Sequence, residues 1–564
     1  MPRGNSLSAI MLQWPGSSEW FGTTAVGHSL PTLLIPVLVI SMLVVLTWRK
    51  WNAPCGVGIR KHLPPNPLTT FPILGSLPQL LTTDKPSYKF TEELLAEHGP
   101  IILLKSGQRR HVFVGSPDMA RECLETNDLT FASRPKTAAS RYLSFGEDDL
   151  AIAPYGEHWQ FLRNIYTQEL LSTKKYPLFS KIRSEELSLF VRSIMKQQKG
   201  NNPIYVNLSK RIVEISMNMI TMMVTGSRSF PYSDILVSNK SFGKAYSERE
   251  IKEMRSRGPD WRQYSSEITK LFSSPLLEDA IPPLGFVDKI TGRRGKMKRA
   301  RERLEELYED LIKDHKEKRR THPATEADTT FLDALLAMPG PNGQSGLSKE
   351  TVMGLLQSTV ASGSITTSST IEWAMAHLLK NPFCMKKCVE EMDAVVGLER
   401  CVEDSDIPNL PYLRAVVKET FRLTPTGPLL LPHATTARCK IGEFDIPAKA
   451  TVSFHVWAIG RNSQLWQNPQ EFHPDRFLHS DIDVRGQHFE LFPFGAGARR
   501  CPAIDVSMDM VQFTLARLIQ SFTWSFIGDK THEQLDMTEV PGMTLRKKKP
   551  MELNATPRLS PSLF

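Results

Sequence analysis

The stretch Phe494-Gly495-Ala496-Gly497-Ala498-Arg499-Arg500-Cys501-Pro502-Ala503 decides the fold of this chain. Its two glycines permit a tight turn that delivers the sulfur of Cys501 to the start of a helix, and Pro502 suits the first helical position. Residues 503–519 continue in a helical pattern. A sulfur at a helix N-terminus, beside two arginines, is favoured as the thiolate. The stretch therefore predicts a cysteine thiolate that can bind a haem iron.

This stretch resembles the haem-binding signature of the cytochrome P-450 superfamily, Phe-x-x-Gly-x-Arg-x-Cys-x-Gly. Every fixed position matches except the last, where Ala503 replaces glycine. The competing interpretation of Gly495 and Gly497 is a dinucleotide-binding loop, but no third glycine follows and a Cys-Pro pair opens the helix. The resemblance implies haem b (heme, iron protoporphyrin IX) with Cys501 as its axial ligand.

Other motifs of the family occur in the expected order. Glu419 and Arg422, one helical turn apart, resemble the Glu-x-x-Arg of the helix beneath the haem, and Arg476 resembles the third member of their buried network. The resemblance also places five residues at the cofactor besides Cys501. These are Trp159, Arg163, His433, Phe494 and Arg499.

The oxygen-activation motif of the family, Ala/Gly-Gly-x-Asp/Glu-Thr-Thr, is replaced here by the sequence from Ser362 to Thr367, SGSITT. By resemblance, Gly363 leaves room for dioxygen and the hydroxyl of Thr366 helps to relay a proton. The usual acid is Ile365, which cannot relay protons, so Ser364, Ser362 or ordered water would have to substitute. We therefore expect Gly363, Ser364 and Thr366 to be the catalytic residues.

Three functions remain open at this point. The first is monooxygenation, in which one oxygen atom enters a small lipophilic substrate of the secondary-metabolite or fatty-acid type; retention of Thr366 favours it. The second is a haem-thiolate isomerase or dehydratase that works without a reductase, and the third is a non-enzymatic haem sensor. The distal motifs disfavour the third. An apolar pocket is expected along residues 136–145, 357–366, 426–431 and 541–543, which suits a lipophilic molecule.

Four segments, PYGEHWQFLR, SDIPNLPYLRAVVKETFRL, DVRGQHFELFPFG and TLRKKKPMELNATPRL, look like the land-plant A-type branch that includes flavonoid and phenylpropanoid hydroxylases. The resemblance implies a role in secondary metabolism. It also implies an anchor in the endoplasmic reticulum and a membrane-bound, NADPH-dependent flavoprotein reductase, with cytochrome b5 as a second candidate electron donor.

The N-terminal sequence predicts a membrane anchor. Residues 30–48 are apolar and uncharged, and basic residues follow them from Arg49, so the positive-inside rule places the first 29 residues in the lumen and the catalytic domain in the cytosol. A proline-rich linker, residues 49–85, is expected to be extended rather than helical. The apolar segment 281–287 before a basic run is expected to be either an interfacial membrane contact or an ordinary packed loop.

Residues 86–564 are expected to form one haem-thiolate domain, mainly α with a minor β portion. Helices are predicted over residues 299–320 and 352–379, and short strands over 111–114 and 439–446. The formal net charge is +9. No nucleic-acid motif accompanies this charge, so we expect no nucleic acid and favour an anionic membrane surface or an acidic protein partner. The seven irregularly spaced cysteines indicate a reducing compartment.

Overall fold

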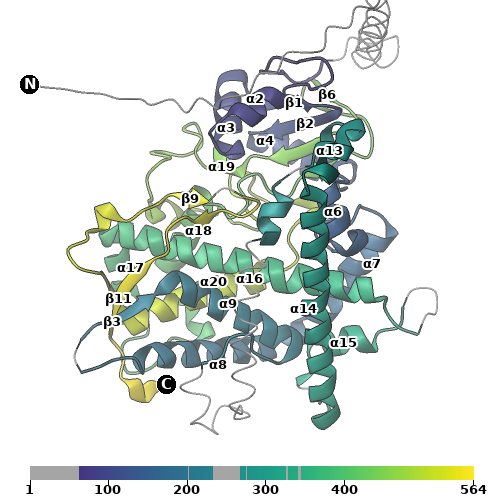
Figure 1. Ribbon diagram of the computed structural model, residues 1–564. Helices are drawn as coiled ribbons and strands as arrows, with labels where there is room; N and C mark the ends of the chain where they lie inside the picture. The colour runs from purple at the N-terminus through teal and green to yellow at the C-terminus, as the bar shows by residue number, and fades with distance from the viewer. Residues whose placement is uncertain are drawn as a thin grey trace, which may run out of the picture. The chain divides into compact units, whose positions relative to one another are not determined.

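A single long helix, α16 (Lys349–Lys380), organises the fold. It begins where Ser348 accepts a hydrogen bond from the Thr351 amide at 3.0 Å, and it ends before Pro382, which cannot continue it. Helices α9 (Leu208–Thr225), α18 (Pro411–Leu423) and α20 (Ile504–Ser521) pack most closely against it. Figure 1 shows α16 running through the middle of this helical layer. The helix predicted over residues 352–379 is confirmed.

The computed structural model describes residues 62–200, 202–232, 267–274, 276–325, 328–340, 345–540 and 542–564. The predicted lumenal tail, residues 1–29, the anchor, residues 30–48, and the linker up to residue 61 lie outside these ranges. Within the ranges, no helix combines the length and the apolar character that a membrane crossing requires.

The remaining helices surround this central layer. The longer ones are α3 (Ser87–His98), α7 (Glu157–Ile165), α8 (Tyr176–Met195), α14 (Arg293–Thr321), α15 (Phe331–Ala337) and α17 (Pro382–Val395). The short ones are α2 (Leu77–Thr82), α4 (Pro117–Arg121), α5 (Asp128–Phe131), α6 (Ala138–Leu143), α12 (Leu277–Ala280), α13 (Gly285–Ile290) and α19 (Val456–Ile459). The helix predicted over residues 299–320 is confirmed as the greater part of α14.

Two sheets join distant parts of the chain. The first has the order β1-β2-β7-β4 and contains β1 (Ile101–Ser106), β2 (Arg109–Val114), β4 (His433–Ala434) and β7 (Thr451–Phe454). The second has the order β3-β11-β8 and contains β3 (Ile204–Asn207), β8 (Phe522–Phe526) and β11 (Glu552–Pro557). Its central strand is thus β11, although β11 comes last in the sequence. A two-stranded ladder pairs β9 (Glu539–Val540) with β10 (Arg546–Lys547).

The structure corrects three sequence predictions. The segment predicted as one strand over 439–446 is a hairpin of β5 (Cys439–Ile441) and β6 (Phe444–Ile446), because Gly442 turns the chain with a φ of 55°. The apolar segment 281–287 is a short 3-10 turn followed by α13. The cysteine-bearing turn leads into a helix that begins at Ile504 rather than at Pro502.

The described part of the linker is also different from the prediction. Residues 62–82 pack on the domain: the Leu103 amide donates to Pro65 O at 2.8 Å, and the Ser76 amide donates to Lys105 O at 2.6 Å. The chain then forms α2, where an extended connector was predicted. The compact unit therefore includes these residues, and the boundary predicted at residue 86 falls too late in the sequence.

Candidate functional site

The Cys501 turn is shaped by its two glycines. Gly495 and Gly497 have φ values of 73° and 65°, which disfavour residues with a side chain. A Cβ on Gly497 would also lie 2.4 Å from Leu124 O and from the Asp128 carboxylate. The Asp128 carboxylate accepts the Ala498 amide at 2.9 Å, and the Cys501 amide donates to Phe494 O at 2.9 Å. The turn is thereby fixed in the position that presents the sulfur.

The surroundings of Cys501 act on its thiol in opposite directions. Burial raises the pKa of the thiol, while the Ala503 amide, Arg163 and Arg500 act in the opposite direction. Arg163 donates to Arg500 O at 3.0 Å, which holds its guanidinium beside the turn. A metal ion on the sulfur would supply the further positive charge that a buried thiolate needs.

Three buried or half-buried arginines, Arg134, Arg163 and Arg499, gather beside this turn. Arg499 donates to Ala153 O at 2.6 Å, and its guanidinium lies 4.4 Å from the centre of the Trp159 ring. Burial, and then the charges of Arg134 and Arg163, lower the pKa of Arg499 to about 8. Within the described ranges, none of the three arginines forms an ion pair with a carboxylate.

This cluster fits the cofactor that the sequence predicts. Buried Asp149 acts on Arg134, but it is a single carboxyl whose own pKa is raised by burial. Three clustered cations with so little negative charge around them are unfavourable unless a ligand supplies more. Haem has two propionates, and guanidinium groups are well suited to bind carboxylates. Arg134, Arg163 and Arg499 would therefore hold the propionates while Cys501 ligates the iron. Sequence reasoning did not single out Arg134, which is buried and donates to Leu431 O and Pro432 O at 2.8 and 2.9 Å.

The other predicted cofactor residues surround the same turn. His433 is buried beside Arg134 and Arg499, which reinforce the effect of burial and keep its pKa well below the ordinary value. Its Nδ1 lies 2.8 Å from Phe131 O, so this nitrogen carries the proton. The Trp159 indole N–H donates to Leu150 O at 3.1 Å. The Phe494 and Phe421 rings pack edge to face, with 5.1 Å between their centres.

The predicted buried network is present. The Glu419 carboxylate accepts from Arg422 Nε and Nη2, both at 2.7 Å, and from Arg476 Nε at 3.2 Å. The His473 amide donates to it at 2.8 Å. The side chains of Glu419 and Arg422 are fully buried. The network joins α18 to the segment 471–476 and belongs to the scaffold, because every donor and acceptor named here faces protein.

The middle of α16 is the second half of the site. Most of this helix is buried, but Ser362 is exposed, and Gly363, Ile365 and Thr366 are half-buried. The Thr366 hydroxyl donates to Ser362 O at 2.6 Å, one turn back. Tyr166 lies between this helix and the cysteine turn. Its hydroxyl forms a hydrogen bond with Thr359 of α16, and a negative charge on Cys501 contributes to raising its pKa.

The position of Ser364 does not support its predicted catalytic role. Successive residues of a helix are about 100° apart, so Ser364 faces away from Thr366, whereas Ser362 shares a face with it. Ser364 is buried and donates to Val360 O at 2.6 Å. Gly363 faces α9: a Cβ there would lie 3.1 Å from Ile220 Cδ1. Ser362 is therefore the serine hydroxyl that lies on the same face of α16 as Thr366.

Residues 64–555 match the family model described as Cytochrome P450. The chain belongs to the cytochrome P450 family. Cytochrome P450 703A2 of Arabidopsis thaliana is 34% identical over 537 residues, covering 94% of this chain and 99% of the relative. The flavonoid 3'-monooxygenase of the same plant is 33% identical over 540 residues, with coverage of 94% and 99%. These relatives support the assignment to the plant A-type branch.

Two further comparisons extend this result. Strychnine-11-hydroxylase of Strychnos nux-vomica is 33% identical over 498 residues, which cover 88% of this chain and 92% of the relative. A zebra fish cytochrome P450 solved with progesterone has a TM-score of 0.67 at 24% identity, covering 84% of this chain and all of its own. The solved structure supports the P450 fold, mainly helical with minor sheets. The predicted family, haem-thiolate cofactor and monooxygenase activity are confirmed.

Proposed function

We propose that this P450 hydroxylates a small, lipophilic, ring-containing substrate, with Cys501 as the haem ligand and the Thr366 hydroxyl as the proton-relay group. The thiolate-bound haem supplies the oxygen chemistry when reduced. The observation that carries the proposal is that exposed Ser362 and half-buried Thr366 share one face at the centre of a helix that is otherwise mostly buried. Ser362 passes a proton to Thr366 in place of the acid that Ile365 lacks.

The substrate class rests on the relatives. Their names specify hydroxylation of a flavonoid, xanthotoxin or strychnine, and all three are lipophilic ring systems. In this chain the apolar segment Pro428–Leu431 lies beside the cysteine turn, where Leu430 Cδ1 comes within 4.0 Å of the Cβ position of Gly495. Buried Thr426 is the polar group next to it. An apolar wall with few polar anchors suits such a substrate.

The test of this function is spectroscopic and then catalytic. The reduced protein with carbon monoxide should show the red-shifted Soret band of thiolate ligation, and Cys501→Ala should abolish it. A spin-state screen of flavonoids, coumarins and alkaloids then identifies binders, which are tested for turnover. An unchanged carbon monoxide spectrum in Cys501→Ala would rule out this ligand, and binders drawn only from fatty acids would rule out the substrate class.

The electron donor is proposed to be a membrane-bound, NADPH-dependent flavoprotein reductase. Arg500 and Arg121 are both exposed on the cysteine-turn side of the domain, and such cations would attract an acidic partner. The competing function, a haem-thiolate isomerase or dehydratase, needs no reductase. Product formation that depends on NADPH and reductase supports the monooxygenase; equal product without them supports the isomerase.

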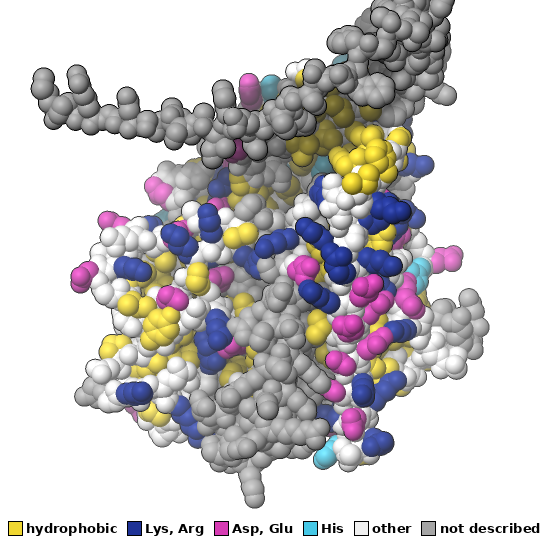
Figure 2. Space-filling model, viewed as in Figure 1, with side chains coloured by type: hydrophobic (Ala, Val, Ile, Leu, Met, Phe, Trp, Pro, Cys, Tyr) yellow, Lys and Arg dark blue, Asp and Glu magenta, His cyan; other side chains and the backbone are white. Residues whose placement is uncertain are grey.

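The domain is proposed to lie on the cytosolic face of the endoplasmic reticulum membrane, anchored through residues 30–48. Phe286 and Ile290 on α13 are 58% and 78% exposed, and the basic start of α14 follows them. Figure 2 shows hydrophobic side chains gathered near this place, with Lys and Arg next to them. Apolar side chains beside cations are typical of an interfacial contact. Phe286→Glu with Ile290→Glu should lower vesicle binding of a variant lacking residues 1–48; unchanged binding would contradict the contact.

A further inference from the structure

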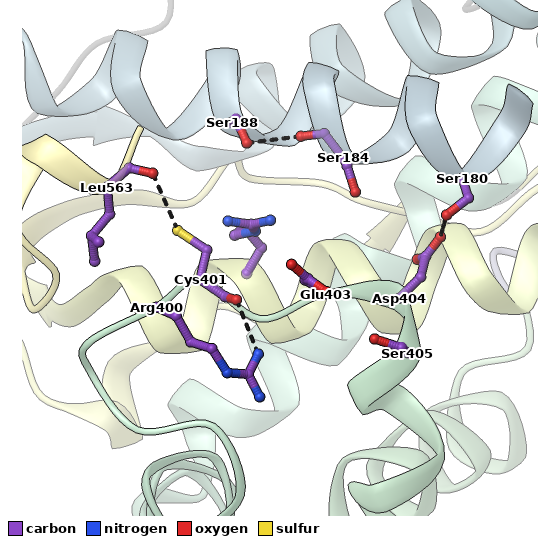
Figure 3. A pocket seen from close by; sticks show the side chains of 10 residues that line it. Ser180, Ser184, Ser188, Arg400, Cys401, Glu403, Asp404, Ser405 and Leu563 are labelled. Carbon is purple, nitrogen blue, oxygen red and sulfur yellow. Dashed lines mark hydrogen bonds between the residues drawn. The ribbon is translucent and has the colours of Figure 1, made fainter. Parts of the chain in front are cut away.

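A polar pocket of about 500 Å³ lies on the domain between α8, α20 and the segment 400–405. Its walls include Ser184 and Ser188 of α8, the Cys401 thiol and Arg517 of α20. Figure 3 shows the Ser184 side chain pointing into this space. Arg517 is 13 residues beyond Ile504, about 20 Å along α20 at 1.5 Å per residue, so this pocket is separate from the cysteine turn.

Arg517 is the unusual member of this pocket. Its side chain is only 3% exposed, and its Nε and Nη1 atoms are buried without a hydrogen-bond partner. The guanidinium lies against the Cys401 thiol. Within the described parts of the chain, it forms no ion pair with a carboxylate. Glu403 and Asp404 act on it only at longer range. A buried cation without a directly paired counter-ion is costly, so a negatively charged ligand would stabilise this arrangement.

The carboxylates nearest to Arg517 are largely committed to other groups. Asp404 accepts from Ser180 at 2.7 Å and from Arg183 Nε at 3.1 Å. Asp406 pairs with Arg400 at 2.7 and 2.8 Å. Exposed Glu403 is the remaining carboxylate in the pocket wall. Glu403 can compete with a ligand for Arg517, but it cannot fill a pocket of this volume.

The pocket is also held in place before any ligand arrives. Gln520 of α20 donates to Gly397 O and Arg400 O at 2.9 and 2.8 Å, and it accepts the Val402 amide at 2.7 Å. The segment that carries Cys401 is thereby fixed to the helix that carries Arg517. A rigid wall lowers the entropy cost of binding.

We propose that this pocket binds a small oxyanion, a phosphate or carboxylate group, through the guanidinium of Arg517 and the hydroxyl of Ser184. Guanidinium groups bind both kinds of anion through directed hydrogen bonds. The site is independent of the haem and of the proposed function. It is a second ligand site at the far end of the helix that follows the iron-binding cysteine.

Cys401 gives a local readout of this site in the full-length, haem-loaded protein. The rate of its alkylation by neutral iodoacetamide is measured by peptide mass spectrometry against inorganic phosphate or acetate, at ionic strength held constant with sodium chloride. Half-buried Cys439 in β5 is the internal control. An anion at about ten times its Kd should slow Cys401 about tenfold and leave Cys439 unchanged. The anion that saturates at the lower concentration identifies the ligand group.

Variants separate the site from general salt effects. Arg517→Met should remove the saturable protection, whereas Arg320→Met, on exposed α14, should retain it. Ser184→Leu removes the second proposed anion donor and leaves Arg517 unchanged, so it should also weaken the saturable protection. This variant tests the site even if Arg517→Met does not fold. Glu403→Gln should shift protection to lower anion concentrations. Equal slowing of Cys401 and Cys439, or no saturation with either anion in the unmodified protein and in Glu403→Gln, would overturn the proposal.

Discussion

Replacing Glu419 by glutamine should destabilise the protein more than any other single change in its buried charge network. The carboxylate faces two guanidinium groups and one amide, at 2.7 to 3.2 Å, and no solvent reaches it. Glutamine keeps the volume but turns one acceptor into a donor that faces other donors. Removing one partner of a buried ion pair costs about 3–5 kcal/mol, so we expect a loss in this range.

The same network predicts an order among variants. Arg476→Met leaves Glu419 paired with Arg422, and it should cost only about 1–3 kcal/mol. The matched control is Glu390→Gln on α17, where the carboxylate is 61% exposed and pairs with Lys386. A surface pair of this kind contributes little, so the change should be close to the measurement error.

The assay is urea unfolding of the haem-loaded protein, followed by Soret absorbance and by tryptophan fluorescence. Both probes report the free energy of unfolding, and a fall in the transition midpoint at a constant slope indicates a change in stability alone. The reasoning is wrong if Glu419→Gln lies within about 1 kcal/mol of the unmodified protein, or if Arg476→Met costs more than Glu419→Gln.

Three further predictions follow from α16 and its neighbours. Gly354→Ala should lose about 1–3 kcal/mol in urea unfolding, because its Cβ would lie 2.4 Å from Asp148 O, while Gly295→Ala in α14 should be neutral or stabilising; equal effects would contradict this explanation. Burial raises the pKa of Asp149 from 3.8 to about 6, so the folded protein binds a proton there more tightly than the unfolded chain does. This proton binding stabilises the folded protein fully below about pH 4, and the stabilisation is lost as the pH rises through 6. Relative to the unmodified protein, Asp149→Asn should therefore gain up to about 3 kcal/mol between pH 4 and pH 7, and a pH-independent difference would refute the assigned pKa. Thr366→Ala and Ser362→Ala should lower the product formed per NADPH about tenfold or more, whereas Ser364→Ala should change it by less than about twofold, and a large loss in Ser364→Ala would restore that residue to the relay.

The sequence predicted the parts of this P450 that depend on local pattern. The cysteine turn, the central helix and the Glu419–Arg422 pair follow from spacing within one segment, whereas the place of Arg476 in their network came from the family resemblance. The side of the helix on which Ser364 lies could also have been predicted, since about 100° per residue places it opposite Thr366. The prediction of Ser364 as a relay residue rested on its chemistry and not on its position on the helix, and the Ser364→Ala variant tests it.

Other features could not be obtained from local pattern. Arg134 has no motif around it, and its role follows only from the packing that brings it to Arg499. The parallel pairing of β2 with β7 joins residues about 340 positions apart, for example His111 and Thr451, and no single-sequence periodicity specifies such a partner. The Arg517 pocket likewise depends on four separate segments whose contact is tertiary.

The place of β11 in the middle of its sheet has a consequence for biosynthesis. Its two neighbours, β3 and β8, are made earlier, yet each must wait for residues 552–557 before its hydrogen bonds with β11 can form. On the ribosome, both strands therefore present unpaired edges until the chain has been made past residue 551. Such edges are prone to mispairing, so nascent chains of this P450 should depend on chaperones late in synthesis. A chain cut short before Glu552 should aggregate even though it retains the whole cysteine turn.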